Sequence, residues 1–240
     1  MKYSVQLYTL RDDIKDAAGL LRILPEVRKI GFEGVEFAGF YGLDPVTLKE
    51  ALDDAGLIVT GTHCGMGDFM PDTIDSTIAF HKALGTNLIG TGGGPHRTDA
   101  DADRTSLIFK WANKYGESRG VKFYYHTHYT EFYPLESGRL PVDVIAAGAY
   151  MEIDTYWSFH AKADTRGWLL ANKDRVAALH IKDGVDGHPC ALGEGQNDLP
   201  TVVQTAKDIG INWLILENDD PKPTGIEDIK RSYAWLKEHE

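Results

Sequence analysis

The sequence predicts a single-domain (β/α)8 barrel, a TIM barrel, that spans residues 1–240. Its length of 240 residues lies within the range of about 200 to over 400 residues typical of one such barrel. Apolar or β-branched runs alternate with amphipathic segments of helical length, which is the pattern of βαβ units in a parallel sheet. Histidine and carboxylate residues end several of these runs, and the active site of such a barrel lies at the ends of its strands.

Eight runs of aliphatic, aromatic and β-branched residues are the predicted strands. In chain order they span residues 2–9, 34–40, 57–64, 87–92, 121–128, 150–157, 176–183 and 213–219. The amphipathic segments that follow them are the predicted helices. These segments lie near residues 16–30, 45–55, 72–84, 101–118, 139–147, 164–172, 200–209 and 225–238.

Proline and glycine mark the ends of these helices. Pro45 and Pro200 fall at or near a first helical turn, where the missing N–H of proline costs no hydrogen bond. A glycine follows the predicted end of each of five helices, as expected for a C-cap, at Gly31, Gly56, Gly85, Gly120 and Gly210.

The composition argues against several classes of function. The formal net charge of −11 opposes association with a phosphate backbone, so we expect no nucleic-acid partner. No apolar run approaches the roughly 18–20 residues of a membrane span, and the N-terminus lacks the apolar stretch of a signal peptide. Cys64 and Cys190 are too few for a disulfide framework, which fits a reducing compartment. We therefore expect a cytoplasmic protein with no membrane partner.

Polar residues at the ends of the last four predicted strands indicate a metal site. Asp154, His180 and Glu217 end three successive strands after apolar stretches, where an unpaired carboxylate would carry a large desolvation cost. His126 and His128 lie two residues apart near the end of the preceding strand, so they share one face of it. Imidazole together with carboxylate suits one divalent transition-metal ion rather than Ca²⁺. We favour Mn²⁺, with Zn²⁺ or Co²⁺ as alternatives.

Other residues near the strand ends are candidates for supporting roles. Lys182 either neutralises a developing oxyanion or pairs with Asp183. Glu36 and His63 either bind substrate hydroxyl groups or have structural roles. Glu152 lies one layer deeper than Asp154, and its partner is not evident. Aromatic residues are candidates for an apolar wall against a sugar ring, at Tyr8, Phe40, Trp157 and Phe159.

Motifs spread over nearly the whole chain carry a family resemblance. They are QLYTLRDD at the first strand, GFEGVEFAGFYG at the second, GTH at the third, YYHTHYTEF at the fifth, MEIDTYW at the sixth, LHIKD at the seventh, and ALGEGQND with WLILENDD around the eighth. As a set, they resemble the sugar isomerase/epimerase family with the xylose-isomerase-like barrel. That family also includes inosose dehydratase, keto-sugar 3-epimerases and, more remotely, endonuclease IV.

The resemblance implies a divalent metal ion held by four residues at strand ends. These map to His126, Asp154, His180 and Glu217. In the epimerases the ligand on the fifth strand is a glutamate that also serves as one of two acid/base groups, whereas this chain has histidine there. On that strand His126, His128 and Glu131 therefore remain alternatives.

The resemblance further implies an isomerase or epimerase that acts on a keto sugar, or on an aldose and its ketose, through an enediolate. Glu217 is then the expected base. His128 is a candidate second proton carrier, because an unperturbed imidazole pKa of about 6.5 suits acid/base catalysis. Lys182 would stabilise the oxyanion. The partner would be a small-molecule carbohydrate.

Three other functions remain open from the sequence. A lyase or hydrolase acting on a 3-keto glycoside or an inositol derivative would use the same first proton abstraction. A DNA-repair nuclease of the endonuclease IV type is disfavoured by the net charge of −11, and a non-catalytic sugar-binding barrel is the remaining alternative. Aromatic residues near Trp157 and Phe159 are candidates for a homodimer contact.

Overall fold

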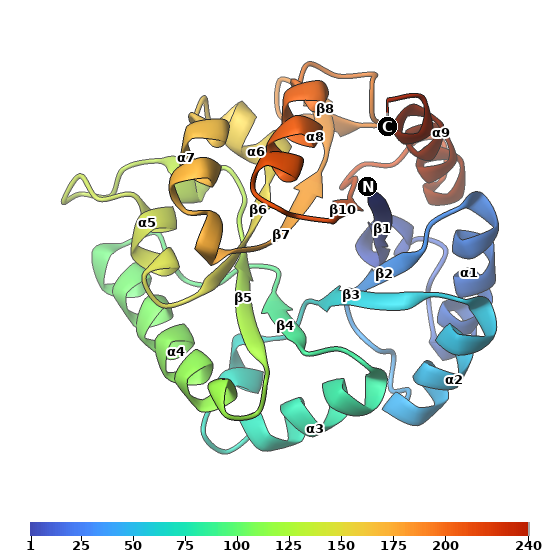
Figure 1. The fold of residues 1–240 in the computed structure, drawn as a ribbon, viewed down its shortest axis with the longest axis horizontal. Helices are drawn as coiled ribbons and strands as arrows, with labels where there is room; N and C mark the ends of the chain where they lie inside the picture. The colour runs from blue at the N-terminus through green and yellow to red at the C-terminus, as the bar shows by residue number, and fades with distance from the viewer. Residues whose placement is uncertain (240) are drawn as a thin grey trace.

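The computed structural model describes residues 1–239, and its strands and helices form the predicted barrel (Figure 1). Eight parallel strands surround the centre. They are β1 (Lys2–Gln6), β2 (Gly34–Phe37), β3 (Ile58–Thr62), β4 (Leu88–Thr91), β5 (Lys122–His126), β6 (Tyr150–Asp154), β7 (Val176–Ile181) and β10 (Trp213–Leu216). The strand order is β3-β2-β1-β10-β7-β6-β5-β4. A single parallel bridge between His63 and Gly90 joins the two edge strands and closes the barrel.

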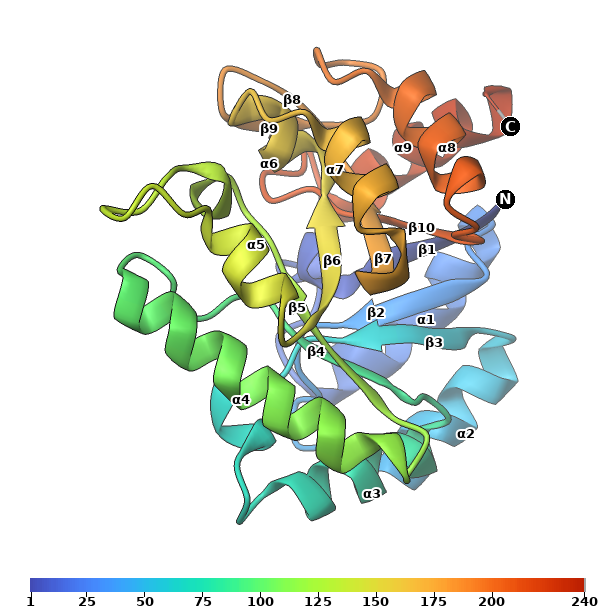
Figure 2. The ribbon, with the colours of Figure 1, turned by 60° about the vertical axis from the view of Figure 1, so that its left-hand side comes forward.

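Helices cover the outside of the barrel, as Figure 2 shows for α4 and α5 beside β5. The α-helices are α1 (Ala17–Ile30), α2 (Pro45–Ala55), α3 (Ile74–Leu84), α4 (Asp99–Glu117), α5 (Pro141–Ala146), α6 (Thr155–His160), α7 (Thr165–Ala171), α8 (Leu199–Asp208) and α9 (Gly225–Glu238). Short 3-10 helices are η1 (Leu7–Leu10), η2 (Met66–Phe69), η3 (Thr130–Phe132) and η4 (Lys173–Arg175). No helix within residues 1–239 is long and apolar enough to cross a membrane.

The predicted helix ends are confirmed where caps set them. Gly56 and Gly85 adopt left-handed φ angles of 70° and 94° as C-caps of α2 and α3. The Asp44 side chain accepts hydrogen bonds from two backbone N–H groups at the start of α2, and Pro45 occupies the first turn. A carboxylate cap and a proline in the first turn both favour a helix start.

Several predicted strands are too long at their C-terminal ends. The first strand ends at Gln6, because the Gln6 side chain accepts a hydrogen bond from Tyr8 N (3.1 Å) and begins η1. The sixth ends at Asp154, whose carboxylate caps α6, so that residues 155–157 are helical instead of extended. After β7 the chain forms a hairpin of β8 (Asp183–Val185) and β9 (His188–Cys190), which is not among the predicted elements.

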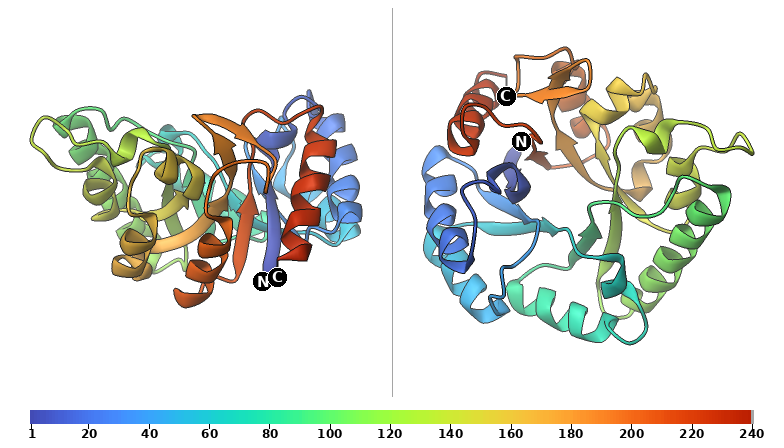
Figure 3. Two further views of the ribbon diagram at one scale, coloured as in Figure 1. Left: turned by 90° about the horizontal axis from the view of Figure 1, so that it is seen from above. Right: turned by 180° about the vertical axis from the view of Figure 1, so that it is seen from behind.

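The two ends of the barrel differ in what they present. The N- and C-termini lie together at the end where the strands begin, as the left view of Figure 3 shows. The β8–β9 hairpin lies at the opposite end, where the strands finish. Inside the barrel, Tyr124 of β5 packs against Gly90 of β4, where an added Cβ would lie 2.2 Å from the tyrosine ring. Because residue 90 is a glycine, the Tyr124 ring fits inside the barrel below the C-terminal ends of the strands.

Candidate metal centre and active site

The four predicted metal ligands lie together at the ends of the strands. His126 and Asp154 are the last residues of β5 and β6, His180 lies near the end of β7, and Glu217 directly follows β10. One potential ligand atom from each lies within 4.8 Å of those of the other three, and all four residues are buried. Glu217 Oε2 lies 3.0 Å from His180 Nδ1 and 3.9 Å from His126 Nε2. The parallel register places their side chains around one point.

Asp154 is oriented by the helix that follows it. Its Oδ1 accepts hydrogen bonds from Tyr156 N (3.0 Å) and Trp157 N (2.8 Å) at the start of α6. A carboxylate in this N-cap position satisfies backbone N–H groups that have no partner within the helix. With Oδ1 used in this way, Oδ2 is the atom directed toward the other ligands.

Lys182 is a cation buried among three carboxylates. Its Nζ lies 2.8 Å from Asp154 Oδ2, 2.7 Å from Glu217 Oε2 and 2.7 Å from Asp219 Oδ2. The side chain is fully buried, and its ammonium lies 5.5 Å from the centre of the Trp157 ring. This lysine is therefore part of the site rather than a solvated surface charge.

The alternative pairing of Lys182 with Asp183 is wrong. The Asp183 carboxylate instead accepts hydrogen bonds from the backbone N–H groups of Gly184, Gly193, Gly195 and Asn197, at 2.9–3.0 Å. It thereby holds the loop before α8. Asp219 is not among the residues that the sequence patterns single out, although its position two residues after Glu217 is a usable signal.

Beneath the four predicted ligands, one oxygen of Glu152 contacts three imidazoles. Glu152 Oε2 lies 2.8 Å from His63 Nε2, 3.1 Å from His126 Nδ1 and 3.1 Å from His180 Nε2. This second group, made of His63, His126, Glu152 and His180, also has potential ligand atoms within 4.8 Å of one another. The sequence had left the partner of Glu152 open. The partners of Glu152 are histidines at the ends of three other strands.

Glu36 lies below His180 and is fully buried. It accepts hydrogen bonds from Gln6 Nε2 (2.8 Å) and from the Tyr124 hydroxyl group, and it lies 2.7 Å from His180 Nε2. It does not belong to the residues that line the cavity above the cluster. In this structure, Glu36 contacts a predicted metal ligand rather than the space in which a substrate would bind.

The two proposed histidine ligands have pKa values shifted in opposite directions. Burial alone would lower the pKa of His180, but Glu152, Glu217 and Glu36 outweigh burial and hold that pKa well above the usual range. Burial, together with the charge of His180, holds the pKa of His126 well below its usual range. His126 is therefore a neutral imidazole at neutral pH.

Glu217 and Lys182 stabilise each other's charged forms. Burial would raise the pKa of Glu217, yet Lys182 and His180 keep it well below the usual range. Burial would lower the pKa of Lys182, and Asp154, Glu217 and Asp219 hold it well above that range. Glu217 is therefore ionised at neutral pH, as both a metal ligand and a general base must be.

The chemistry of this donor set fits a divalent cation. Five carboxylates lie close together around one buried ammonium and the imidazoles, namely Glu36, Glu152, Asp154, Glu217 and Asp219. In addition, Glu152 Oε1 is buried and has no hydrogen-bond partner within residues 1–239. Uncompensated buried carboxylate charge is costly, and a cation would offset it.

A cavity of about 370 Å³ lies over the cluster. Its walls include Glu217, Asp219, His126 and two predicted substrate contacts, His63 and Tyr8. His128 and two small residues, Ala38 and Gly92, complete the lining. Trp157, a third predicted substrate contact, does not line this cavity; it is 9% exposed and packs beside Lys182. It is also too buried to serve the suggested dimer contact, whereas Phe159 is 39% exposed.

The three alternatives for the metal ligand on the fifth strand lie in different places. His126 lies in the ligand group, whereas His128 lies beyond the end of β5 with its ring centre 4.9 Å from that of His126. Glu131 is fully buried elsewhere, where it accepts hydrogen bonds from His128 N (3.1 Å) and the Tyr125 hydroxyl group (2.8 Å). Glu131 thus holds the backbone that carries His128 and is absent from both candidate ligand groups.

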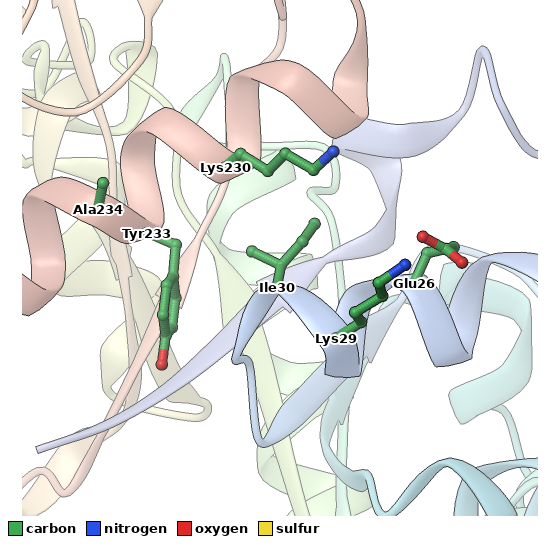
Figure 4. A pocket seen from close by; sticks show the side chains of 6 residues that line it. All are labelled: Glu26, Lys29, Ile30, Lys230, Tyr233 and Ala234. Carbon is green, nitrogen blue, oxygen red and sulfur yellow. The ribbon is translucent and has the colours of Figure 1, made fainter.

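Among the other hollows, two lie near the end of the barrel where the strands begin. Figure 4 shows one of about 270 Å³ between α1 and α9, lined by Ile30, Lys230 and Tyr233 among others. A groove of about 1110 Å³ lies near the start of β5 and β6, where Lys122 and Tyr150 line it. Neither hollow includes a residue of the two candidate ligand groups, and active sites of (β/α)8 barrels lie at the opposite end of the strands.

The two cysteines are free thiols and do not have the properties of nucleophiles. Cys64 Sγ lies 3.5 Å from His81 Nε2, but burial raises the pKa of this thiol to about 12. Burial and nearby acidic groups raise the pKa of Cys190 to about 11. Thiolate is the reactive form of cysteine, so both side chains should be unreactive at neutral pH.

Both thiols are therefore expected to alkylate slowly in the native protein. Relative to an ordinary thiol pKa of 9.0, a pKa of about 12 lowers the thiolate fraction of Cys64 near neutral pH by about 10³-fold. Iodoacetamide should label Cys190 before Cys64, and both should react much faster in urea. Peptide mass spectrometry measures the two rates separately. Native Cys64 that reacts as fast as the unfolded chain would contradict the assignment.

Comparison with known proteins identifies the family. The model of the xylose isomerase-like TIM barrel family matches residues 24–239. The chain belongs to this family. No protein with a curated description matches it in sequence.

Several solved structures resemble this one in fold. A sugar phosphate isomerase/epimerase from Parabacteroides distasonis ATCC 8503 has a TM-score of 0.84 and 22% identity, over 98% of this chain and 93% of that one. The 3-keto-D-glucoside 4-epimerase from E. coli has a TM-score of 0.72 and 17% identity, over 99% of both chains. The probable 3-DHS dehydratase of petrobactin synthesis from Bacillus anthracis has a TM-score of 0.77 and 14% identity, over 99% of both chains.

Proposed function

We propose that this protein is a divalent-metal-dependent isomerase or epimerase that acts on a carbohydrate through an enediolate. The observation that carries the proposal is the convergence of His126, Asp154, His180 and Glu217 under a cavity of about 370 Å³. The xylose isomerase-like family and the isomerases and epimerases among its structural neighbours agree with this reaction class.

The four ligands would hold one ion, with Mn²⁺ favoured and Zn²⁺ or Co²⁺ as alternatives, because two imidazoles and two carboxylates suit these metals. When bound, such an ion supplies a Lewis acid for a sugar carbonyl group and its neighbouring hydroxyl group. Glu217 and His126 line the cavity, so the ion would be open to substrate on that side.

Proton transfer would fall to residues of this chain that line the cavity. Glu217 is ionised, and within residues 1–239 only its Oε2 is engaged by His180 and Lys182. We assign Oε1 as the atom that removes a proton from the carbon next to the carbonyl group. His128 is the proposed second proton carrier, because it lies in the same wall and Glu131 fixes its backbone. Lys182 would keep Glu217 ionised and offset developing negative charge.

A lyase or hydrolase acting on a 3-keto glycoside or an inositol derivative is the second candidate. One observation favours it: among the described residues, the only carboxylates that line the cavity are Glu217 and Asp219, and both are paired with Lys182. The epimerase pattern of two opposed carboxylate bases would need one from β5, but Glu131 is held away from the cavity. An elimination needs only one such base, followed by an acid.

The cavity walls favour an uncharged polyhydroxy substrate. Within residues 1–239 the lining includes no lysine or arginine, so the cavity offers no such cation to a phosphate group or a nucleic-acid backbone. An endonuclease role is therefore not proposed. A non-catalytic sugar-binding barrel would retain the cavity but would not exchange substrate protons.

Exchange of a substrate proton with solvent is the direct test of this function. We expect that, with Mn²⁺ in D₂O, the protein incorporates deuterium next to the carbonyl group of unphosphorylated keto sugars or 3-keto glycosides. NMR or mass spectrometry measures the incorporation. Exchange with isomer formation supports the isomerase or epimerase, and exchange with loss of water or aglycone supports the second candidate. Metal binding without exchange on a panel of these sugars would contradict both.

A further inference from the structure

Glu152 is placed to act on the metal centre without touching a substrate. It is a fully buried residue of β6 and does not line the cavity over the cluster. Its Oε2 is the shared partner of His63, His126 and His180, which come from three different strand ends. Any effect of this carboxylate on chemistry must therefore pass through the imidazoles.

The geometry fixes which nitrogen of His126 carries hydrogen. His126 Nδ1 faces Glu152 Oε2 at 3.1 Å, whereas Nε2 faces Glu217 Oε2 at 3.9 Å. An ionised carboxylate only accepts hydrogen bonds, so Nδ1 is the donor and Nε2 of the neutral ring keeps its lone pair. The low pKa of His126 agrees with a neutral ring. The lone pair is thus directed toward the proposed ion.

His180 and His63 contact Glu152 from other sides. His180 Nε2 faces Glu36 (2.7 Å) and Glu152 (3.1 Å), and His180 Nδ1 faces Glu217 (3.0 Å), so both nitrogens carry hydrogen in the metal-free protein and Nδ1 gives up its proton when it binds the ion. Gln6 Nε2 lies 3.3 Å from His63 Nδ1, so Nδ1 accepts and His63 Nε2 donates to Glu152. The amide of Gln6 is oriented by its oxygen, which accepts from Tyr8 N.

We infer that Glu152 is a positioning residue for the metal centre: its Oε2 holds the N–H groups of His126 and His180, so that the ligand atoms are His126 Nε2 and His180 Nδ1. The inference rests on the metal site of the proposed function. Carboxylates that accept the second N–H of a ligating histidine fix its tautomer and ring orientation, and losing such a partner typically lowers metal affinity by about 10–100-fold. The deeper group, made of His63, His126, Glu152 and His180, then supports the proposed metal ligands and is not a second metal site.

The first test is the tautomer of His126 in the metal-free protein. ¹⁵N NMR of the imidazoles should show wild-type His126 with hydrogen on Nδ1. Glu152→Ala should lose this preference, and Glu152→Gln should keep it, because an amide oxygen can accept the same hydrogen bond. Glu131→Ala removes another buried glutamate that contacts no proposed metal ligand; it can shift the His126 signals through His128, but it should keep hydrogen on His126 Nδ1. Hydrogen on Nε2 in the wild-type protein would overturn the inference without any variant.

The second test is metal affinity, measured by titration with Mn²⁺. We expect Glu152→Ala to weaken binding by about 10–100-fold, Glu152→Gln to recover part of the loss, and Glu131→Ala to bind like the wild-type protein. Unchanged affinity in Glu152→Ala would overturn the inference. So would metal binding that survives Asp154→Asn but disappears in Glu152→Gln, because the ion would then lie in the deeper group. Failure of the wild-type protein to bind metal would contradict the proposed function, while the His126 tautomer would still test Glu152.

Discussion

Asp154→Asn is expected to abolish stoichiometric metal binding and to slow proton exchange on the substrate by about 10³-fold. The substitution removes the charge of one of four ligands but leaves α6 capped, because asparagine is as good an N-cap as aspartate. Loss of the Lewis acid removes several kcal/mol of transition-state stabilisation, and about 4 kcal/mol corresponds to about 10³ in rate. Elemental analysis and the deuterium exchange assay measure the two effects.

The chain offers a matched control for this variant. Asp164 caps α7 by accepting a hydrogen bond from Gly167 N (2.9 Å), and it lies outside the two candidate ligand groups. Asp164→Asn should therefore retain about one ion per chain and the wild-type exchange rate. Full metal content in Asp154→Asn, and likewise in His180→Ala, would show that the four-residue centre is wrongly assigned.

Lys182→Met is expected to destabilise the metal-free protein by about 3–5 kcal/mol. Lys182 is fully buried, and removing it leaves Asp154, Glu217 and Asp219 without their common cation. Breaking a buried ion pair by deleting one partner typically costs about that much, because the remaining charges stay desolvated. Urea unfolding in the presence of a chelator measures the loss. Added Mn²⁺ should restore part of the stability, since the ion replaces the missing positive charge.

Lys114→Met is the matched control for the lysine substitution. Lys114 pairs with Glu117 on α4, and the two side chains are 82% and 69% exposed. Exposed ion pairs contribute little to stability because water and salt screen them, so this variant should unfold almost like the wild-type protein. If Lys182→Met and Lys114→Met had equal effects, Lys182 would not be the counter-ion of the buried carboxylates.

Much of the fold could be predicted from local patterns. Asp44, Pro45 and Gly56 delimit α2 through interactions within a few residues, so sequence inspection finds both ends of that helix. The strand ends were harder to place. Residues 155–157 read as the continuation of a strand, because threonine, tyrosine and tryptophan all favour extended structure. The capping bonds of Asp154 outweigh that preference and turn the chain into α6.

The convergence of the four proposed metal ligands could also be predicted, because a parallel barrel brings the ends of its strands to one side. His126, Asp154, His180 and Glu217 lie near the ends of four strands that are neighbours in the sheet. Assigning these residues to strand ends was therefore enough to predict that they lie close together. The choice among His126, His128 and Glu131 was not settled in this way, because it depends on how the chain turns after β5.

The sequence by itself determined the barrel, its helix caps and the identity of four residues that converge at one end of it, since these follow from short-range periodicity and strand direction. Only the tertiary structure decided that Glu152 Oε2 meets three histidines, that Glu36 lies under His180, and that Lys182 joins Asp219 rather than Asp183. Such contacts depend on the register between strands that are far apart in the chain and on the direction of each side chain inside the barrel. No local pattern carries that information.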